Sequence, residues 1–248
     1  MNNSDEILPR VDLDSVLAEI EIDLAWREDE LRHFENRISS ELDISELEKT
    51  IETKPLVLFL YAHFEGHAKL MLTVYVNALN NCQLDCKKVV FPLIASNLHS
   101  EFGALKNPDK KHPLFPNEYE PGFKELGRRI EFFEHLDDIL TKSLELDVDN
   151  IVDTESNLKP DVLKKIFFRL GFQVERINDN EFGKIHRLLQ LRNNFAHGSR
   201  LEGISYREYE EIKDIIWIVL RKIKDLVIDY LSNSKFYRDN NISLNSHA

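Results

Sequence analysis

The amino-acid sequence predicts an all-α protein, a helical bundle with long helices. Only eight glycines and eight prolines occur among the 248 residues, and such scarcity disfavours the many tight turns of a β-sheet protein. Apolar residues recur at steps of three, four and seven along most of the chain, which is the period of one helix face. With 42% apolar and 31% charged residues, the composition is that of a soluble globular protein.

Several segments carry the helical pattern strongly enough to set approximate bounds. The expected helices cover residues 12–40, 47–79, 89–105, 123–146, 160–170, 179–197 and 205–232. Asp12 is the expected cap of the first helix, and Pro55 either begins the main part of the second or kinks it. Pro160 stands at a favoured first-turn position, and Gly171 ends the same helix. The last helix is expected to bury one face, made of Tyr209, Ile212, Ile216, Val219, Ile223 and Leu226.

One helical domain is expected over residues 1–235, with a loop inserted into the bundle at residues 106–122. That segment, KNPDKKHPLFPNEYEPG, contains four prolines and is the clearest loop in the chain. Residues 236–248 are rich in Asn and Ser and are expected to form a flexible tail.

The sequence favours a cytoplasmic protein that is not held in a membrane. No apolar run approaches the ~20 residues that a membrane span needs, and the start, MNNSDEILPR, has no apolar stretch typical of a secretory signal. Cys82 and Cys86 are four residues apart, and we expect them to lie on one helix as reduced thiols. Two thiols alone make no zinc site, and neither a metal nor another cofactor is expected.

The net charge of −12 is unevenly distributed along the chain. Residues 1–52 hold 16 acidic and 5 basic residues, whereas residues 159–200 hold 9 basic and 4 acidic residues. A polyanion should therefore meet the C-terminal half of the protein, with the first helix turned away. The acidic stretch itself is interpreted as a solvated face.

The candidate for chemistry is the segment LLQLRNNFAHGSR, residues 188–200, at the end of an expected helix. RNA cleavage by its own 2′-hydroxyl needs a group that moves a proton and a group that stabilises charge on phosphorus. His197 can do the first, and Arg192 offers a planar fork that matches phosphate oxygens. Asn193 either supports them or is a helix-end amide. Because five residues turn a helix by about 140°, Arg192 and His197 cannot lie side by side on a regular helix. Either the helix unwinds before Gly198, or a second chain supplies half of the site.

A purely structural role is the alternative for the same residues. His197 would then satisfy the carbonyls of a helix end, and Arg192 would pair with an acid in the core. A second pair, Arg129 and His135, has a similar spacing, but it lies mid-helix without a following glycine and is interpreted as chance.

Weaker candidates lie elsewhere in the chain. Glu65 could pair with Arg192 or take part in proton transfer, and Asn194 adds a second amide beside the motif. His63 and His67 are four residues apart and could share a metal ion, although their order with the intervening Glu differs from that of zinc proteases. Three bases either steer RNA or form a solvated helix face: Lys164, Lys165 and Arg169.

The Arg-x4-His motif, with a polar residue after the Arg, resembles the motif of HEPN ribonucleases, and the segment Tyr61–Gly66 (YAHFEG) resembles a stretch of bacterial HEPN proteins encoded near defence systems. The resemblance implies a HEPN-like bundle and a metal-independent endoribonuclease that works through the 2′-hydroxyl and leaves a cyclic phosphate. It further implies a homodimer with both motifs facing one cleft, a role as a toxin or anti-phage defence effector, an RNA substrate such as tRNA, and a regulatory or antitoxin partner protein.

Two alternatives remain open within the same resemblance. The chain could be a non-catalytic HEPN module that binds RNA, a nucleotide or a protein partner, with the motif serving dimer packing. It could also be a toxin that is silenced by nucleotidyl transfer to a tyrosine. Relatives regulated in that way have a Tyr two residues after the His, whereas Ser199 stands at that place here and the nearest tyrosine is Tyr206.

Overall fold

The computed structural model describes residues 11–40, 46–107, 109, 121–198 and 202–238. Every regular element in these ranges is a helix, apart from two isolated β-bridges. The predicted all-α class is therefore confirmed. None of the described helices has an apolar stretch that could cross a membrane.

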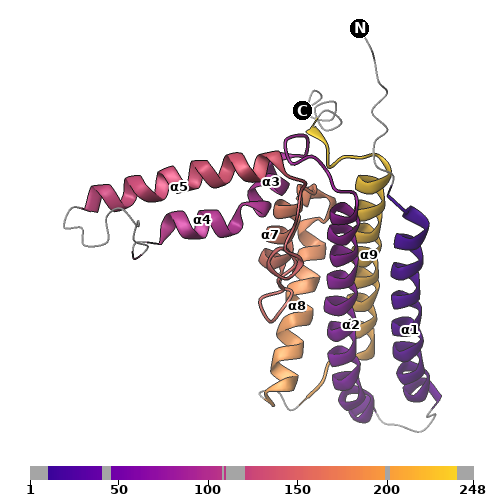
Figure 1. Ribbon diagram of the computed structural model, residues 1–248. Helices are drawn as coiled ribbons and strands as arrows, with labels where there is room; N and C mark the ends of the chain where they lie inside the picture. Colours follow the sequence, from indigo (N-terminus) through magenta and orange to yellow (C-terminus); the bar gives the residue numbers. More distant parts are fainter. Residues whose placement is uncertain (1–10, 41–45, 108, 110–120, 199–201, 239–248) are drawn as a thin grey trace.

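Four long helices stand side by side and form the bundle (Figure 1). They are α1 (Leu13–Ser40), α2 (Glu46–Asn81), α8 (Asp179–Ala196) and α9 (Tyr206–Ser232). Helix α2 is central, since it packs against α1, α8 and α9. Its apolar residues are buried nearly all round the helix, as expected for a core helix with three neighbours.

Local sequence signals fix where several helices begin and end. Asn178 and Glu181 form a reciprocal capping box at the start of α8. Ser205 caps α9 by accepting a hydrogen bond from the backbone N–H of Glu208. Pro55 lies inside α2, so it does not begin that helix, and its exposed ring faces outward.

A smaller layer packs on one side of the bundle. It consists of α3 (Phe91–Asn97), α6 (Val148–Ile151), α7 (Pro160–Leu170) and the short 3-10 turn Val174–Arg176. Gly171 ends α7 in the left-handed conformation, with φ 74°, where a side chain would be strained. The bounds predicted for this helix, residues 160–170, are confirmed.

The chain remains packed beyond residue 235, where the flexible tail was expected to begin. Phe236 and Tyr237 are buried, and the N–H of Val90 donates to the carbonyl of Phe236 at 2.8 Å. The predicted boundary is thus too early, because two aromatic side chains anchor the segment. Residues 239–248 of the expected tail lie outside the described residues.

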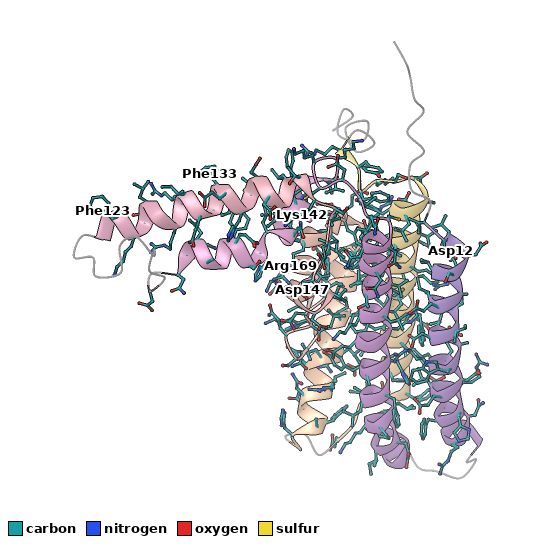
Figure 2. All side chains as sticks on the ribbon, viewed as in Figure 1. Asp12, Phe123, Phe133, Lys142, Asp147 and Arg169 are labelled. Atoms are coloured by element: carbon teal, nitrogen blue, oxygen red, sulfur yellow. The ribbon has the colours of Figure 1, made fainter. Side chains whose placement is uncertain are left out.

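Helices α4 (His99–Lys106) and α5 (Pro121–Thr141) form an arm that projects sideways from the top of the bundle (Figures 1 and 2). The helix expected over residues 89–105 is broken at Leu98 into α3 and α4. The expected loop at 106–122 falls between the two arm helices, mostly outside the described residues, and its last two residues already belong to α5.

The two cysteines do not share a helix, contrary to the expectation from their spacing. Helix α2 ends at Asn81, and Gln83 takes a positive φ of 46°. Cys82 and Cys86 therefore lie in the turns that follow α2, where both are free thiols. No glycine or proline marks this end of the helix, so its position could not be predicted from the sequence.

Candidate active site

The last turn of α8 carries the predicted motif. Leu188, Leu189 and Leu191 are buried and hold this part of α8 against the bundle. The helix continues through Ala196, and His197 is its C-terminal cap, with its N–H donating to the carbonyl of Asn193 at 3.0 Å. The motif therefore lies at a helix end, as predicted.

Arg192 is half-buried and held by two neighbours. Its Nη1 donates to Oδ1 of Asn193 at 2.9 Å, and its guanidinium carbon lies 5.3 Å from the ring centroid of Tyr61 on α2. Among the residues that the structure describes, no carboxylate is within ion-pair distance of Arg192. The described residues therefore do not support the alternative in which Arg192 pairs with an acid of the core.

Tyr61, whose ring lies next to Arg192, is one helical turn before Glu65 on α2. Burial, followed by the negative charge of Glu65, raises the pKa of Tyr61 well above its usual value, while the positive charge of Arg192 acts in the opposite direction. A neutral phenol ring therefore supports the Arg192 guanidinium. Tyr61 was not among the predicted site residues, although it begins the YAHFEG segment that carried the resemblance.

His197 and Asn194 are exposed at the surface of the same helix end. Since the helix is regular through Ala196, Arg192 and His197 leave it about 140° apart. Arg192 donates a hydrogen bond to Asn193, which lies one helical turn before His197 on the same face of α8.

The connection after the motif is fastened to the start of α2. The hydroxyl of Thr53 accepts from the N–H of Ile204 at 3.0 Å and donates to the carbonyl of the same residue at 2.9 Å. Gly203 lies so close to α2 that a Cβ there would fall 1.7 Å from the carbonyl oxygen of Thr50. These contacts fix the position of the chain that enters α9.

The three bases expected to steer RNA have contacts within the protein. Lys164 lies 4.4 Å above the ring of Phe182, and Lys165 forms an ion pair with Glu155. Arg169 donates to the carbonyl of Asn150 at 2.8 Å, which joins α7 to α6. Arg169 thus has a packing role, while an RNA role for the two lysines stays a prediction.

The second Arg–His pair lies far from this place in the fold. Arg129 forms an ion pair with Glu125 on the exposed surface of α5, and His135 is exposed on the same arm. The arm helix α5 packs against α4 rather than against the bundle helices. This surrounding fits the interpretation that the second pair is a chance match.

His63 and His67 face different carboxylates of α1. Nδ1 of His67 lies 2.6 Å from Oδ2 of Asp23, which also accepts from Nε of Arg27 at 2.7 Å, whereas Nε2 of His63 lies 3.1 Å from Oε2 of Glu30. In the described part of the chain, no three His, Cys, Asp or Glu side chains are grouped to hold a metal ion. His67 also lines a groove of about 370 Å³ between α1, α2 and α9, which neither Arg192 nor His197 lines.

Comparison with known proteins places the chain in a family. The family model described as RiboL-PSP-HEPN matches residues 22–229, which span α1 to α9 and include the motif on α8. No curated protein and no solved structure matches the chain. Because the match covers most of the sequence, the chain belongs to the RiboL-PSP-HEPN family of the HEPN superfamily.

Proposed function

We propose that the protein is a metal-independent endoribonuclease of the HEPN type. The observation that carries the proposal is the state of Arg192: a guanidinium held by Asn193 and Tyr61, with no carboxylate of the described residues to neutralise it, at the end of the same helix as an exposed histidine. A cation in this setting keeps its charge and its outer N–H groups for an anion such as phosphate.

His197 moves the protons in the proposed reaction. A neutral imidazole accepts the proton of the ribose 2′-hydroxyl, the 2′-oxygen attacks the adjacent phosphorus, and the bond from phosphorus to the 5′-oxygen breaks. The leaving 5′-oxygen takes up a proton from an imidazolium. The products are a 2′,3′-cyclic phosphate and a 5′-hydroxyl end, and no electron is exchanged with a cofactor.

Arg192 stabilises the charge that builds up on the phosphate oxygens during the attack. Its planar fork suits two of these oxygens. Asn193 fixes one edge of the guanidinium through its Oδ1, so it is a positioning residue. Glu65 acts on Arg192 indirectly. It lies beside Tyr61, and the ring of Tyr61 supports the guanidinium from α2.

Two copies of the chain would complete the site. Arg192 and His197 leave α8 about 140° apart along a regular helix, and in the proposed dimer the facing copy supplies the partner across a shared cleft. A homodimer therefore belongs to the proposal. Family membership supports the homodimer, because the resemblance to HEPN ribonucleases implies a dimer in which both motifs face one cleft.

An RNA substrate such as tRNA and a role as toxin or anti-phage defence effector complete the proposal. A ribonuclease of this kind would damage its own host unless it were restrained. We therefore expect a regulatory or antitoxin partner protein that keeps it inactive.

Expression in bacterial cells tests the proposal through growth. Wild type should arrest growth at least tenfold more strongly than His197→Ala, because the imidazole carries the proton transfers. His186→Ala is the matched control, since His186 is an exposed histidine on the same helix, bonded to Gln190, and should leave the arrest unchanged. Equal growth of wild type and His197→Ala, at equal protein levels, would contradict the proposal and favour the binding module.

A further inference from the structure

A groove of about 370 Å³ lies between α1, α2 and α9, and none of the residues that line it belongs to the motif on α8. Part of its wall is apolar, since it is lined by Leu24 of α1 and by Trp217, Ile218 and Leu220 of α9. A cleft of this size, with an apolar lining and a few polar groups, is typical of small-molecule sites. The polar groups of the groove therefore decide which ligand it suits.

A buried histidine supplies the groove with a hydrogen-bond acceptor. His67 of α2 is 1% exposed and lines the groove. Its Nδ1 lies 2.6 Å from Oδ2 of Asp23, and burial, which lowers the pKa of His67, favours a neutral ring that donates this proton to the carboxylate. Nε2 then carries a lone pair, and no described residue donates to it. A ligand with an N–H or O–H group can do so.

Charged side chains of opposite sign line the two ends of the groove. Asp214 comes first along α9, and Arg221 and Lys224 follow about 10 and 15 Å further along the helix axis, at 1.5 Å per residue. Glu28 lies towards the Asp214 end, because α1 runs antiparallel to α9, as two ion pairs between these helices show (Figure 1). One end of the groove is thus basic, and the other is acidic.

Two of these four charges are available to a ligand. Arg221 and Asp214 are exposed, and neither has a hydrogen-bond or ion-pair partner within the described ranges. Lys224 and Glu28 instead form ion pairs with residues of α1, at 2.9 and 4.0 Å. The groove therefore offers a free guanidinium near its basic end and a free carboxylate at its acidic end, with apolar side chains and an imidazole acceptor also in its lining.

We infer that the groove binds a guanosine monophosphate group. The phosphate suits the planar fork of Arg221, and the base lies against the ring of Trp217. The neighbouring N1–H and N2–H groups of guanine donate to the carboxylate of Asp214, while a ribose hydroxyl donates to Nε2 of His67. This site goes beyond the proposed ribonuclease activity and does not depend on it.

Isothermal titration calorimetry of the purified full-length chain with guanosine monophosphate tests the inference. Wild type should bind one nucleotide per chain, and Arg221→Ala and Asp214→Asn should each weaken binding at least tenfold. Arg207→Ala and Asp225→Asn are the matched controls, since both residues are exposed on α9 and do not line the groove, and they should leave binding unchanged. Circular dichroism checks that all variants remain helical.

Adenosine monophosphate tests how the base is recognised. Its base edge places an acceptor nitrogen beside the amino group, so it should bind wild type at least tenfold more weakly than guanosine monophosphate and should be insensitive to Asp214→Asn. Equal binding of the two nucleotides would overturn the assignment of Asp214 to the base.

Arg192→Ala distinguishes the groove from the candidate active site, and it should bind guanosine monophosphate like wild type. Binding that is lost in Arg192→Ala and kept in Arg221→Ala would overturn the inference, and so would a wild type that binds no nucleotide. The guanosine group can come from a free nucleotide or from the end of an RNA. A short RNA with a terminal guanosine phosphate, added to the His197→Ala chain, displaces the nucleotide in the second case and leaves it bound in the first, and either result supports the site.

Discussion

Asp23 and His67 form a buried polar contact between α1 and α2. Burial acts to raise the pKa of Asp23, but its hydrogen bonds to Arg27 and His67 outweigh burial, and the pKa is lowered. Burial lowers the pKa of His67, against the opposing effect of Asp23. A neutral imidazole that donates its Nδ1 proton to an ionised carboxylate fits both directions.

The free energy of unfolding should therefore fall as the pH is lowered from 7.5 to 5. A histidine whose pKa is lower in the folded protein than its usual value of 6.5 takes up a proton on unfolding, so protons favour the unfolded chain below about pH 6.5. Asp23 adds a further loss of stability only near and below pH 3.8, the usual pKa of an aspartate. Urea unfolding at a series of pH values measures the effect.

The variant His67→Gln distinguishes the contribution of His67 to this pH dependence from that of the other histidines. The amide of Gln retains a donor for Asp23 but does not titrate, so the variant should be less stable than wild type at pH 7.5 and lose less stability towards pH 5. An identical pH dependence of wild type and variant would show that the Asp23–His67 contact is not responsible.

At the scale of elements, the connection from α8 to α9 is set by the close approach of Gly203 to α2. A Cβ at this position would meet the carbonyl oxygen of Thr50 at 1.7 Å and Oγ1 of Thr53 at 2.6 Å. Neither backbone can move without breaking the hydrogen bonds between Thr53 and Ile204. The segment that follows the motif therefore depends on a glycine.

Gly203→Ala should lower the free energy of unfolding by about 1–3 kcal/mol, the usual cost of forcing extra volume into a packed place. Gly183→Ala is the opposite case, since Gly183 lies within α8 and a Cβ there meets nothing within 4 Å. It should raise the stability by roughly 0.5–1 kcal/mol through helix propensity. Thermal or urea unfolding compares the two, and a stable Gly203→Ala protein would contradict the described approach to α2.

At the scale of the whole molecule, the helices with strong local signals could be predicted from the sequence. The bounds of α7 follow from Pro160 and Gly171, and α9 begins after its Ser205 cap. All six apolar residues expected on the inner face of α9 are buried. Periodicity and capping are properties of neighbouring residues, so they need no knowledge of the tertiary structure.

Features that arise from tertiary contacts could not be predicted in this way. The amphipathic pattern of α5 resembles that of a bundle helix, yet Ile130 and Phe133 are exposed because this part of α5 packs against α4, and the core is reached only by residues nearer its end, such as Leu136 and Leu140. The position of Tyr61 under Arg192 joins residues from α2 and α8, and no spacing along the chain encodes it. At the site, the motif itself could be found from sequence, while the support of its guanidinium could not.

The central claim is that Arg192 and His197 cleave RNA, and purified protein with total tRNA in the presence of EDTA tests it most directly. Arg192→Ala and His197→Ala are compared with wild type, and the double variant Arg129→Ala/His135→Ala, which removes the similar pair on the arm, serves as the matched control. We predict that wild type and the control cut RNA and leave 2′,3′-cyclic phosphate ends, while each site variant is at least a hundredfold slower. Equal cleavage by wild type and both site variants, or cleavage that stops in EDTA, would contradict the claim.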